Sequence, residues 1–143
     1  MADPHVGTEA GAAPEPLVDP AALATVASLQ RPGAPDLVAR VLGLFAEDAP
    51  NRVAEIAAGV GAFDAETVRV AAHTLKSSAA NVGATRLSSR CALIERAARE
   101  LNLAACMALA DALEALLDDT LEALERSRSE GGAGGTAAGT RAA

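Results

Sequence analysis

Apolar residues recur at three- and four-residue steps through the middle of the chain, the spacing that places them on one side of an α-helix. The pattern starts after Asp19-Pro20, an N-cap followed by proline at the first helical position, and lasts to about Arg128. A short first segment is followed by four amphipathic ones, joined by brief connections. We therefore predict an all-α fold, an antiparallel up-down-up-down four-helix bundle with a short additional N-terminal helix.

Glycine, proline and aspartate divide this pattern into helices. Pro35 opens the second helix, and Pro50 should kink it without ending it, because the apolar period resumes beyond. Asp64 caps the third helix, and Gly83 ends it in the left-handed conformation. The fourth helix carries a stripe from Leu87 to Leu101, and one further helix is predicted around the stripe from Cys106 to Leu124.

The residues that would form the core are small. The chain has 37 alanines among 143 residues, two phenylalanines, and no tryptophan or tyrosine. Strands of β-sandwiches and barrels draw on β-branched and aromatic residues, whereas alanine favours helices and lets them approach closely. We expect residues 1–18 to be a flexible leader, 19–128 the bundle and 129–143 a disordered Gly/Ala-rich tail.

The charge balance and the chain ends exclude several classes of protein. A formal net charge of -7 disfavours a nucleic-acid binder, which needs clustered cations. No apolar run is long enough to span a membrane, and the first residues lack the pattern of a signal peptide. Cys91 and Cys106 make no disulfide framework and lack zinc-ligand spacing. We expect a cytoplasmic protein that binds no metal and no cofactor of its own.

The third predicted helix has two distinct faces. At 100° per residue its core-facing stripe contains Val68, Ala72, Leu75, Ala79 and Val82. A second stripe, more than about 100° away, contains Arg69, His73, Lys76, Ser77 and Ala80. We therefore predict that His73 lies on the surface, with Lys76 and Ser77 beside it, one turn further along the helix.

This second stripe suits a phosphorylated histidine. A neutral imidazole is a nucleophile at cellular pH, and an ammonium group nearby stabilises a transferred phosphoryl group by its charge. Ser77 and Ala80 are small, which leaves room for a partner's active site. Lys76 is the only lysine in the chain, and it lies one turn from the only histidine of the predicted bundle.

The same segment resembles the histidine-containing phosphotransfer (HPt) domains of bacterial phosphorelays. Their core reads approximately Ala-His-x-Leu-Lys-(Gly/Ser), then four variable residues, then a hydrophobic residue, Gly and Ala. Residues 72–77 and 82–84 match this pattern with the same spacing, although Ser77 stands where many members have glycine. Residues 44–50, with Pro50, resemble the segment that precedes this core, and Leu87, Cys91 and Glu95 the helix that follows it.

The resemblance implies a role for each matching residue. His73 would accept a phosphoryl group on Nε2 and give it up again, Lys76 would interact with that group, and Ser77 would keep the approach open. Arg69, Ala80 and Ala84 are the residues expected to dock the partner. The partners implied are receiver domains of response regulators or hybrid kinases, which would supply their own Mg²⁺. The protein would be a monomeric phosphocarrier and not an enzyme, without ATP binding or autokinase activity.

Two other interpretations stay open at this point. A histidine kinase dimerisation and phosphoacceptor domain also displays a helical histidine, but an acidic residue usually follows it, whereas Thr74 follows here. The chain could instead be a helical protein-interaction module in which His73 has no chemical role. Molar mass in solution separates the first alternative from the HPt reading, and phosphoryl transfer to His73 separates the second.

Overall fold

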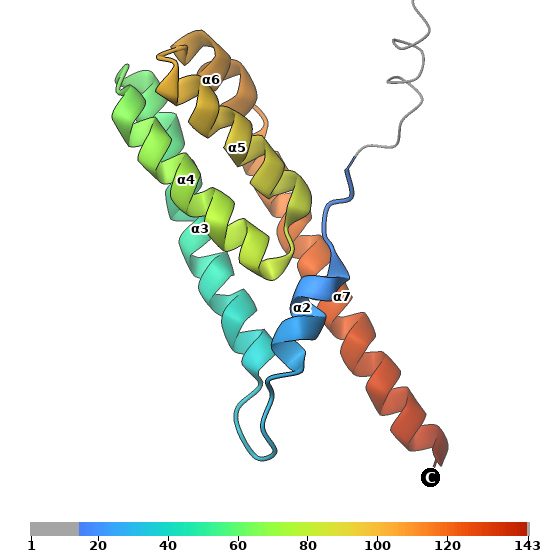
Figure 1. The fold of residues 1–143 in the computed structure, drawn as a ribbon. Helices are drawn as coiled ribbons and strands as arrows, with labels where there is room; N and C mark the ends of the chain where they lie inside the picture. The colour runs from blue at the N-terminus through green and yellow to red at the C-terminus, as the bar shows by residue number, and fades with distance from the viewer. Residues whose placement is uncertain (1–14, 143) are drawn as a thin grey trace, which may run out of the picture.

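Helices are the only regular elements in the part of the chain that the structure, a computed structural model, describes (residues 15–142). They are α2 (Pro20–Ala27), α3 (Leu37–Gly61), α4 (Ala65–Val82), α5 (Thr85–Arg99), α6 (Leu103–Ala110) and α7 (Leu113–Ala142). Figure 1 shows α3, α4 and α5 side by side in alternating directions, with α6 and α7 returning along them and α2 near the end where α4 meets α5. The all-α class predicted from the sequence is confirmed.

Side chains that accept hydrogen bonds from free backbone amides begin four of these helices. Asp19 accepts from the Ala21 amide at the start of α2, as predicted, and Asp36 and Asn102 do the same for α3 and α6. Asp64 caps α4 and also accepts a hydrogen bond from the Thr67 hydroxyl. Such caps satisfy donors that have no partner inside the helix, so they fix where each helix begins.

Helix α3 passes through Pro50 without a break, as the resumed apolar period predicts. Ala49 beside it is fully buried, whereas Pro50 itself faces outward. An outward proline loses one backbone hydrogen bond but leaves the packed side of the helix intact. The helix therefore reaches Gly59, whose missing side chain lets Val68 of α4 come close: a Cβ at Gly59 would lie 2.8 Å from Val68 Cγ2.

The last predicted helix is two helices in the structure. Helix α6 ends at Ala110 and α7 begins at Leu113, with a turn at Asp111 and Ala112. Asp111 keeps right-handed helical backbone angles at this turn. The apolar stripe therefore continues in phase from Cys106 to Leu113, and the periodicity could not reveal the lost hydrogen bonds.

The two ends of the chain differ from expectation in one respect. Helix α7 continues to Ala142, where the sequence predicts a disordered tail over residues 129–143. A helix that is already nucleated gains one backbone hydrogen bond for each residue added, and alanine is the best helix former, so extension is possible despite the glycines. Most of the predicted leader lies outside the described residues, and residues 15–19 are not helical.

The core is built of alanine and medium-sized aliphatic side chains, as the composition predicts. The predicted core stripe of α4 (Val68, Ala72, Leu75, Ala79, Val82) is buried along its whole length. It packs against α3 on one side and α5 on the other. The phase of α4 is thereby fixed, and the residues that it turns outward are those of the second stripe.

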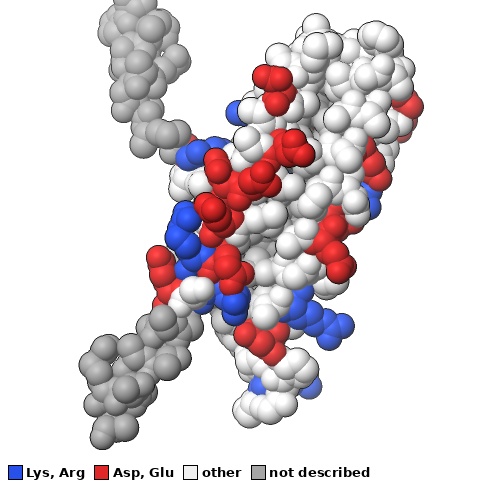
Figure 2. All heavy atoms as spheres, turned by 180° about the vertical axis from the view of Figure 1, so that it is seen from behind, with Lys and Arg blue, Asp and Glu red and all other residues white. Residues whose placement is uncertain are grey.

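Charge is distributed unevenly over this bundle. Figure 2 shows the rear face, where acidic side chains gather along the course of α7.

Among the described residues, no helix combines the length and apolar character that crossing a membrane requires.

Candidate functional site

His73 lies near the middle of α4 and points out of the bundle. Its side chain is 54% exposed, although its neighbour Ala72 is completely buried. The helix that presents it is held at both ends, by the Asp64 cap and by Gly83, whose φ of 80° is left-handed as predicted. The predicted surface position of His73 is confirmed.

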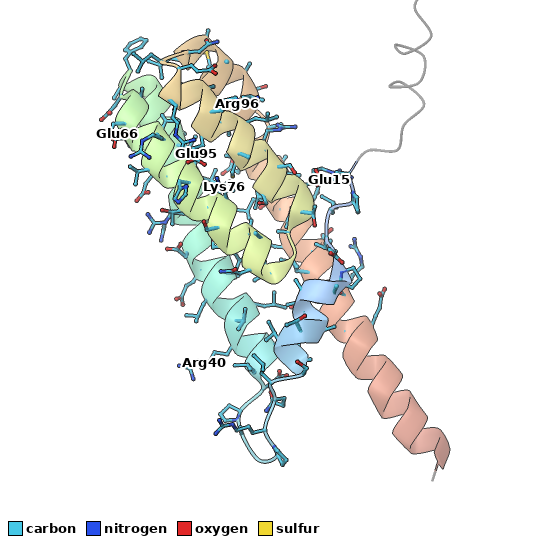
Figure 3. All side chains as sticks on the ribbon, viewed as in Figure 1. Glu15, Arg40, Glu66, Lys76, Glu95 and Arg96 are labelled. Atoms are coloured by element: carbon cyan, nitrogen blue, oxygen red, sulfur yellow. The ribbon has the colours of Figure 1, made fainter. Side chains whose placement is uncertain are left out.

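Behind His73 lies a single buried carboxylate, that of Glu95 on α5. It is 1% exposed and contacts three other side chains. Oε2 lies 2.9 Å from His73 Nδ1 and 2.6 Å from Arg99 Nη2, and Oε1 lies 2.6 Å from Lys76 Nζ. Figure 3 shows Lys76 and Glu95 together where α4 and α5 meet. We call these four residues the Glu95 cluster.

The surroundings of Glu95 keep it ionised. Burial alone would raise the pKa of this carboxyl, and it is the largest single effect. The ion pair with Lys76, the hydrogen bond with His73 and the charge of Arg99 outweigh it and hold the pKa of Glu95 below its ordinary value. Glu95 is therefore a carboxylate at neutral pH, and its oxygens can only accept hydrogen bonds.

This ionisation determines the tautomer of His73. Because Glu95 Oε2 can only accept, Nδ1 must carry the proton in the neutral ring and donate it to the carboxylate. The lone pair of the neutral imidazole then resides on Nε2, the nitrogen not engaged by Glu95. A half-exposed imidazole with its nucleophilic nitrogen free is equipped to attack an electrophile brought by a partner.

Lys76 lies beside His73 as predicted, but it is less exposed than its stripe suggests. Its side chain is 32% exposed because the ammonium group turns back to the buried Glu95 carboxylate. The backbone of Lys76 is also fixed, since its carbonyl oxygen accepts a hydrogen bond from the Ser88 hydroxyl of α5 at 3.1 Å. Lys76 therefore has a structural partner as well as a position near His73.

The other predicted site residues divide into accessible and buried ones. Ser77 and Ala80 are exposed on the same side of α4 as His73. Arg69 is partly exposed and pairs with Glu66, with 2.6 Å between Nη2 and Oε2. The prediction that Ala84 docks a partner is wrong, because Ala84 is 0% exposed. Ala84 lies in the short connection between α4 and α5. Its amide donates a hydrogen bond to the Ala79 carbonyl oxygen, which holds this connection against the end of α4.

Sequence reasoning assigned no role to Glu95 or Arg99. A signal for Glu95 was present, since it directly follows Ile94 and lies four residues after Cys91 on the buried side of α5. A charged residue on such a stripe is rarely left without partners, so it points to an ion pair inside the protein. Arg99 lies one turn further along α5, which places it over the same carboxylate.

The exposed side of the Glu95 cluster is formed by His73 and Arg99, which cover the buried carboxylate. A hollow of about 550 Å³ lies elsewhere, between α2, the start of α3 and α7, and no residue of the Glu95 cluster lines it. Across the described residues, no three His, Cys, Asp or Glu side chains are grouped to hold a metal ion. Cys91 and Cys106 are buried, and burial raises the pKa of the Cys91 thiol to about 12, so it is not a nucleophile at neutral pH.

Comparison with known proteins connects this geometry to a family. The family model described as "Hpt domain" matches residues 40–127. Histidine-containing phosphotransfer protein 2 of Arabidopsis thaliana is 33% identical over 82 residues, which cover 55% of this chain and 53% of the relative. The match thus spans about half the length of that curated relative.

Two solved structures share the fold. The histidine-containing phosphotransfer protein B of Pseudomonas aeruginosa PAO1 superposes with a TM-score of 0.72 at 26% identity, covering 82% of this chain and 98% of that one. A histidine-containing phosphotransfer protein from maize has a TM-score of 0.65 at 25% identity, covering 80% and 86%.

Proposed function

The chain belongs to the Hpt domain family, and on that premise we propose that it is a phosphocarrier of two-component signalling. His73 accepts a phosphoryl group from a receiver-domain aspartate and passes it to another receiver domain. We further propose that the protein is monomeric and cytoplasmic and that its partners are response regulators or hybrid kinases. It needs no metal or nucleotide on this chain, because Mg²⁺ is expected in the receiver's own site.

The observation that carries this proposal is the orientation of His73 by Glu95. The Nε2 lone pair attacks the phosphorus of the aspartyl phosphate, the bond between phosphorus and the aspartate oxygen breaks, and the aspartate leaves as a carboxylate. The proton on Nδ1 stays where it is, so the phosphorylated ring carries a positive charge. Glu95, 2.9 Å from Nδ1, stabilises that charge as it develops.

Lys76 supports the same step with its positive charge. Lys76 follows His73 by three residues on the same face of α4, so its ammonium group can approach an oxygen of the transferred group. Phosphoryl transfer depends mainly on positioning and charge stabilisation, so a fixed cation and an oriented imidazole supply much of what the reaction needs. Reversal of the step returns the phosphoryl group to a second aspartate.

The experiment is a transfer profile. The purified chain is incubated with each phosphorylated receiver domain of its source organism, and the label is tested for the acid lability and alkaline stability of a phosphohistidine. We expect label on this chain with at least one receiver and none on His73→Gln, which should remain folded because Glu95 keeps Lys76 and Arg99 as partners. Absence of transfer from every receiver would sink the proposal and favour an interaction module.

The mass of the unphosphorylated chain in solution is the second readout. A monomer of 14.3 kDa agrees with the proposal. An obligate dimer would instead favour the alternative of a histidine kinase dimerisation and phosphoacceptor domain.

A further inference from the structure

The segment that carries the site has a charge opposite to that of the whole chain. Residues 65–99, which include α4 and α5, contain six of the twelve lysines and arginines but only two glutamates. The chain as a whole has a net charge of -7. In α7, by contrast, six acidic residues precede Gly131 with only Arg126 and Arg128 among them, and Figure 2 shows this acidic surface on the rear face. The segment that carries the site is therefore net positive, whereas α7 is net negative.

Three arginines place this positive charge on the surface. Arg99 is 58% exposed and shares the Glu95 carboxylate with His73. Arg69 is partly exposed, and its pKa is raised mainly by the hydrogen bond to Glu66, with the charge of Glu95 adding to the effect. Arg96 is exposed and forms no ion pair with any residue that the structure describes. Figure 3 shows it on α5 beyond Glu95 and Lys76. We call these three residues the arginine rim.

The residues beside the rim have small side chains. Ser77, Ala80 and Ala92 are exposed, and their side chains are too short to block the approach of another protein to His73. The rim arginines extend further from their helices than these small side chains. The long guanidinium side chains of the rim can contact a partner while the partner's active site reaches Nε2.

We propose that the arginine rim is a docking surface for an acidic surface of the receiver domain, and that Arg96 is a specificity-determining residue of that surface. This inference rests on the proposed function. A receiver that holds Mg²⁺ must present carboxylates around its phosphorylated aspartate, so its approach to a positive rim is attractive, whereas approach to the acidic α7 surface is repulsive. The charge difference between the two surfaces thereby orients the encounter.

Arg96 and Arg99 also lie in the last turn of α5, where positive charge stabilises a helix through its dipole. That local role predicts an effect on thermal stability and none on the partner. The docking role predicts an effect on the encounter rate that salt removes. The two roles are therefore separated by measuring stability and transfer on the same variants.

The experiment compares charge reversals at two arginines. Arg96→Glu changes the rim, and Arg40→Glu makes the same change in net charge at the start of α3, where Arg40 is exposed and lies far from Glu95 in Figure 3. The rate of transfer from a phosphorylated receiver that labels the wild-type chain is measured against receiver concentration, from about 25 mM to about 300 mM NaCl, a range over which screening becomes strong.

We expect Arg96→Glu to lower the second-order rate constant about ten-fold at low salt, and Arg96→Gln to lower it less. Arg40→Glu should change it less than about two-fold, because it leaves the rim intact. The wild-type constant should fall with salt more steeply than that of Arg96→Glu. The limiting rate at saturating receiver should stay unchanged in all three variants, because Arg96 does not touch the reacting atoms.

Three outcomes overturn the inference while the proposed function stands. Equal effects of Arg96→Glu and Arg40→Glu would show that net charge acts and not the rim. A wild-type rate constant that salt does not alter would remove the electrostatic encounter while leaving the phosphocarrier function intact. Self-association of the wild-type chain at low salt, abolished by Arg96→Glu in sedimentation, would make the acidic surface of a second copy the occupant of the rim. If no receiver labels the wild-type chain, the proposed function itself is wrong, and this inference is lost with it.

Discussion

The middle of α4 and its C-terminal end are built on opposite principles. Around His73 the side chains are partly exposed and charged, and one buried carboxylate organises them. At Gly83 the backbone itself is buried, and its carbonyl oxygen accepts a hydrogen bond from the Asp19 amide at 2.8 Å. The first region can change its side chains without unfolding the bundle, whereas the second admits no side chain at all.

The difference teaches where stability and chemistry reside in this helix. Gly83 joins α4 to α5 and anchors the start of α2 through Asp19, so three helices depend on one residue. His73 depends on one neighbour, Glu95, for its orientation. Substitutions at the two regions should therefore affect different measurements: unfolding at Gly83 and transfer rate at the Glu95 cluster.

The largest effect on stability is expected for Gly83→Ala. Its φ of 80° is costly for any residue with a Cβ, and that Cβ would also collide with the Asp19 carbonyl oxygen and the Ala22 side chain. We expect a loss of about 3 kcal/mol in the free energy of unfolding, measured by denaturant titration.

Gly33→Ala is the matched control for that substitution. Gly33 has a φ of 79°, but nothing lies within 4 Å of the added Cβ. Its loss should therefore be only about 1 kcal/mol, the cost of the left-handed backbone alone. Equal losses at the two glycines would contradict the tight junction of α2 with α4.

The next effect concerns the orientation of His73. Glu95→Gln keeps the shape of the side chain but removes the charge that fixes the Nδ1 proton and that, in the proposed mechanism, stabilises the phosphorylated ring. We expect transfer to slow about ten- to a hundred-fold, the range found when a carboxylate that orients a metal-binding histidine is removed.

Nitrogen NMR of the ring distinguishes orientation from general damage. The wild-type neutral ring should show the proton on Nδ1, and Glu95→Gln should show a mixture of the two tautomers. A variant that loses transfer but keeps the Nδ1 tautomer would show that Glu95 acts through its charge and would contradict its role in fixing the tautomer.

A smaller effect is expected for Lys76, whose ammonium has two potential partners. Lys76→Met keeps the apolar stem and removes the charge, and we expect about ten-fold slower transfer from the loss of one electrostatic contact to the phosphoryl group. It also leaves Glu95 Oε1 buried without its cation, so some thermal stability should be lost as well.

The double variant separates these two contributions. With Glu95→Gln as background, the buried charge is gone and Lys76→Met should no longer lower stability. If Lys76 contacts the phosphoryl group directly, transfer still slows in this background. If transfer is unchanged there, Lys76 acts only through Glu95, and its assigned role is wrong.

The sequence predicted the parts of this site that depend on one helix alone. The period of α4 placed Ala72 in the core and His73 outside, and Asp64 and Gly83 marked its ends. What depends on the rotation of a neighbouring helix could not be predicted in this way. The contact of Glu95 with His73 requires knowing how α5 turns against α4, and the ion pair that half-buries Lys76 follows from the same contact. The turn between α6 and α7 escaped notice because it does not disturb the apolar period.

The smallest effect on the free energy of unfolding is expected from acid. It should distinguish the two regions, because Glu95 titrates and Gly83 has no titrating side chain. The pKa of Glu95 in the folded protein lies below its ordinary value of 4.5, since its hydrogen bonds and cationic partners outweigh burial. The stability that this shift contributes is therefore complete above the unfolded value and is lost as the pH falls through the folded one. Asp48, Asp64 and Glu66 also have lowered pKa values, so acid weakens the wild-type chain through several groups at once.

Subtracting a variant isolates the contribution of Glu95. The difference in unfolding free energy between the wild type and Glu95→Gln should be constant from about pH 6 to pH 8 and should shift against the wild type below about pH 4.5. Gly83→Ala should show no such dependence, because its cost is steric and keeps the same value at every pH. A difference for Glu95→Gln that does not change down to the acid transition would mean that the carboxylate has the same pKa in the folded and unfolded chains. The balance between burial and the cations of the Glu95 cluster would then have to be reassigned.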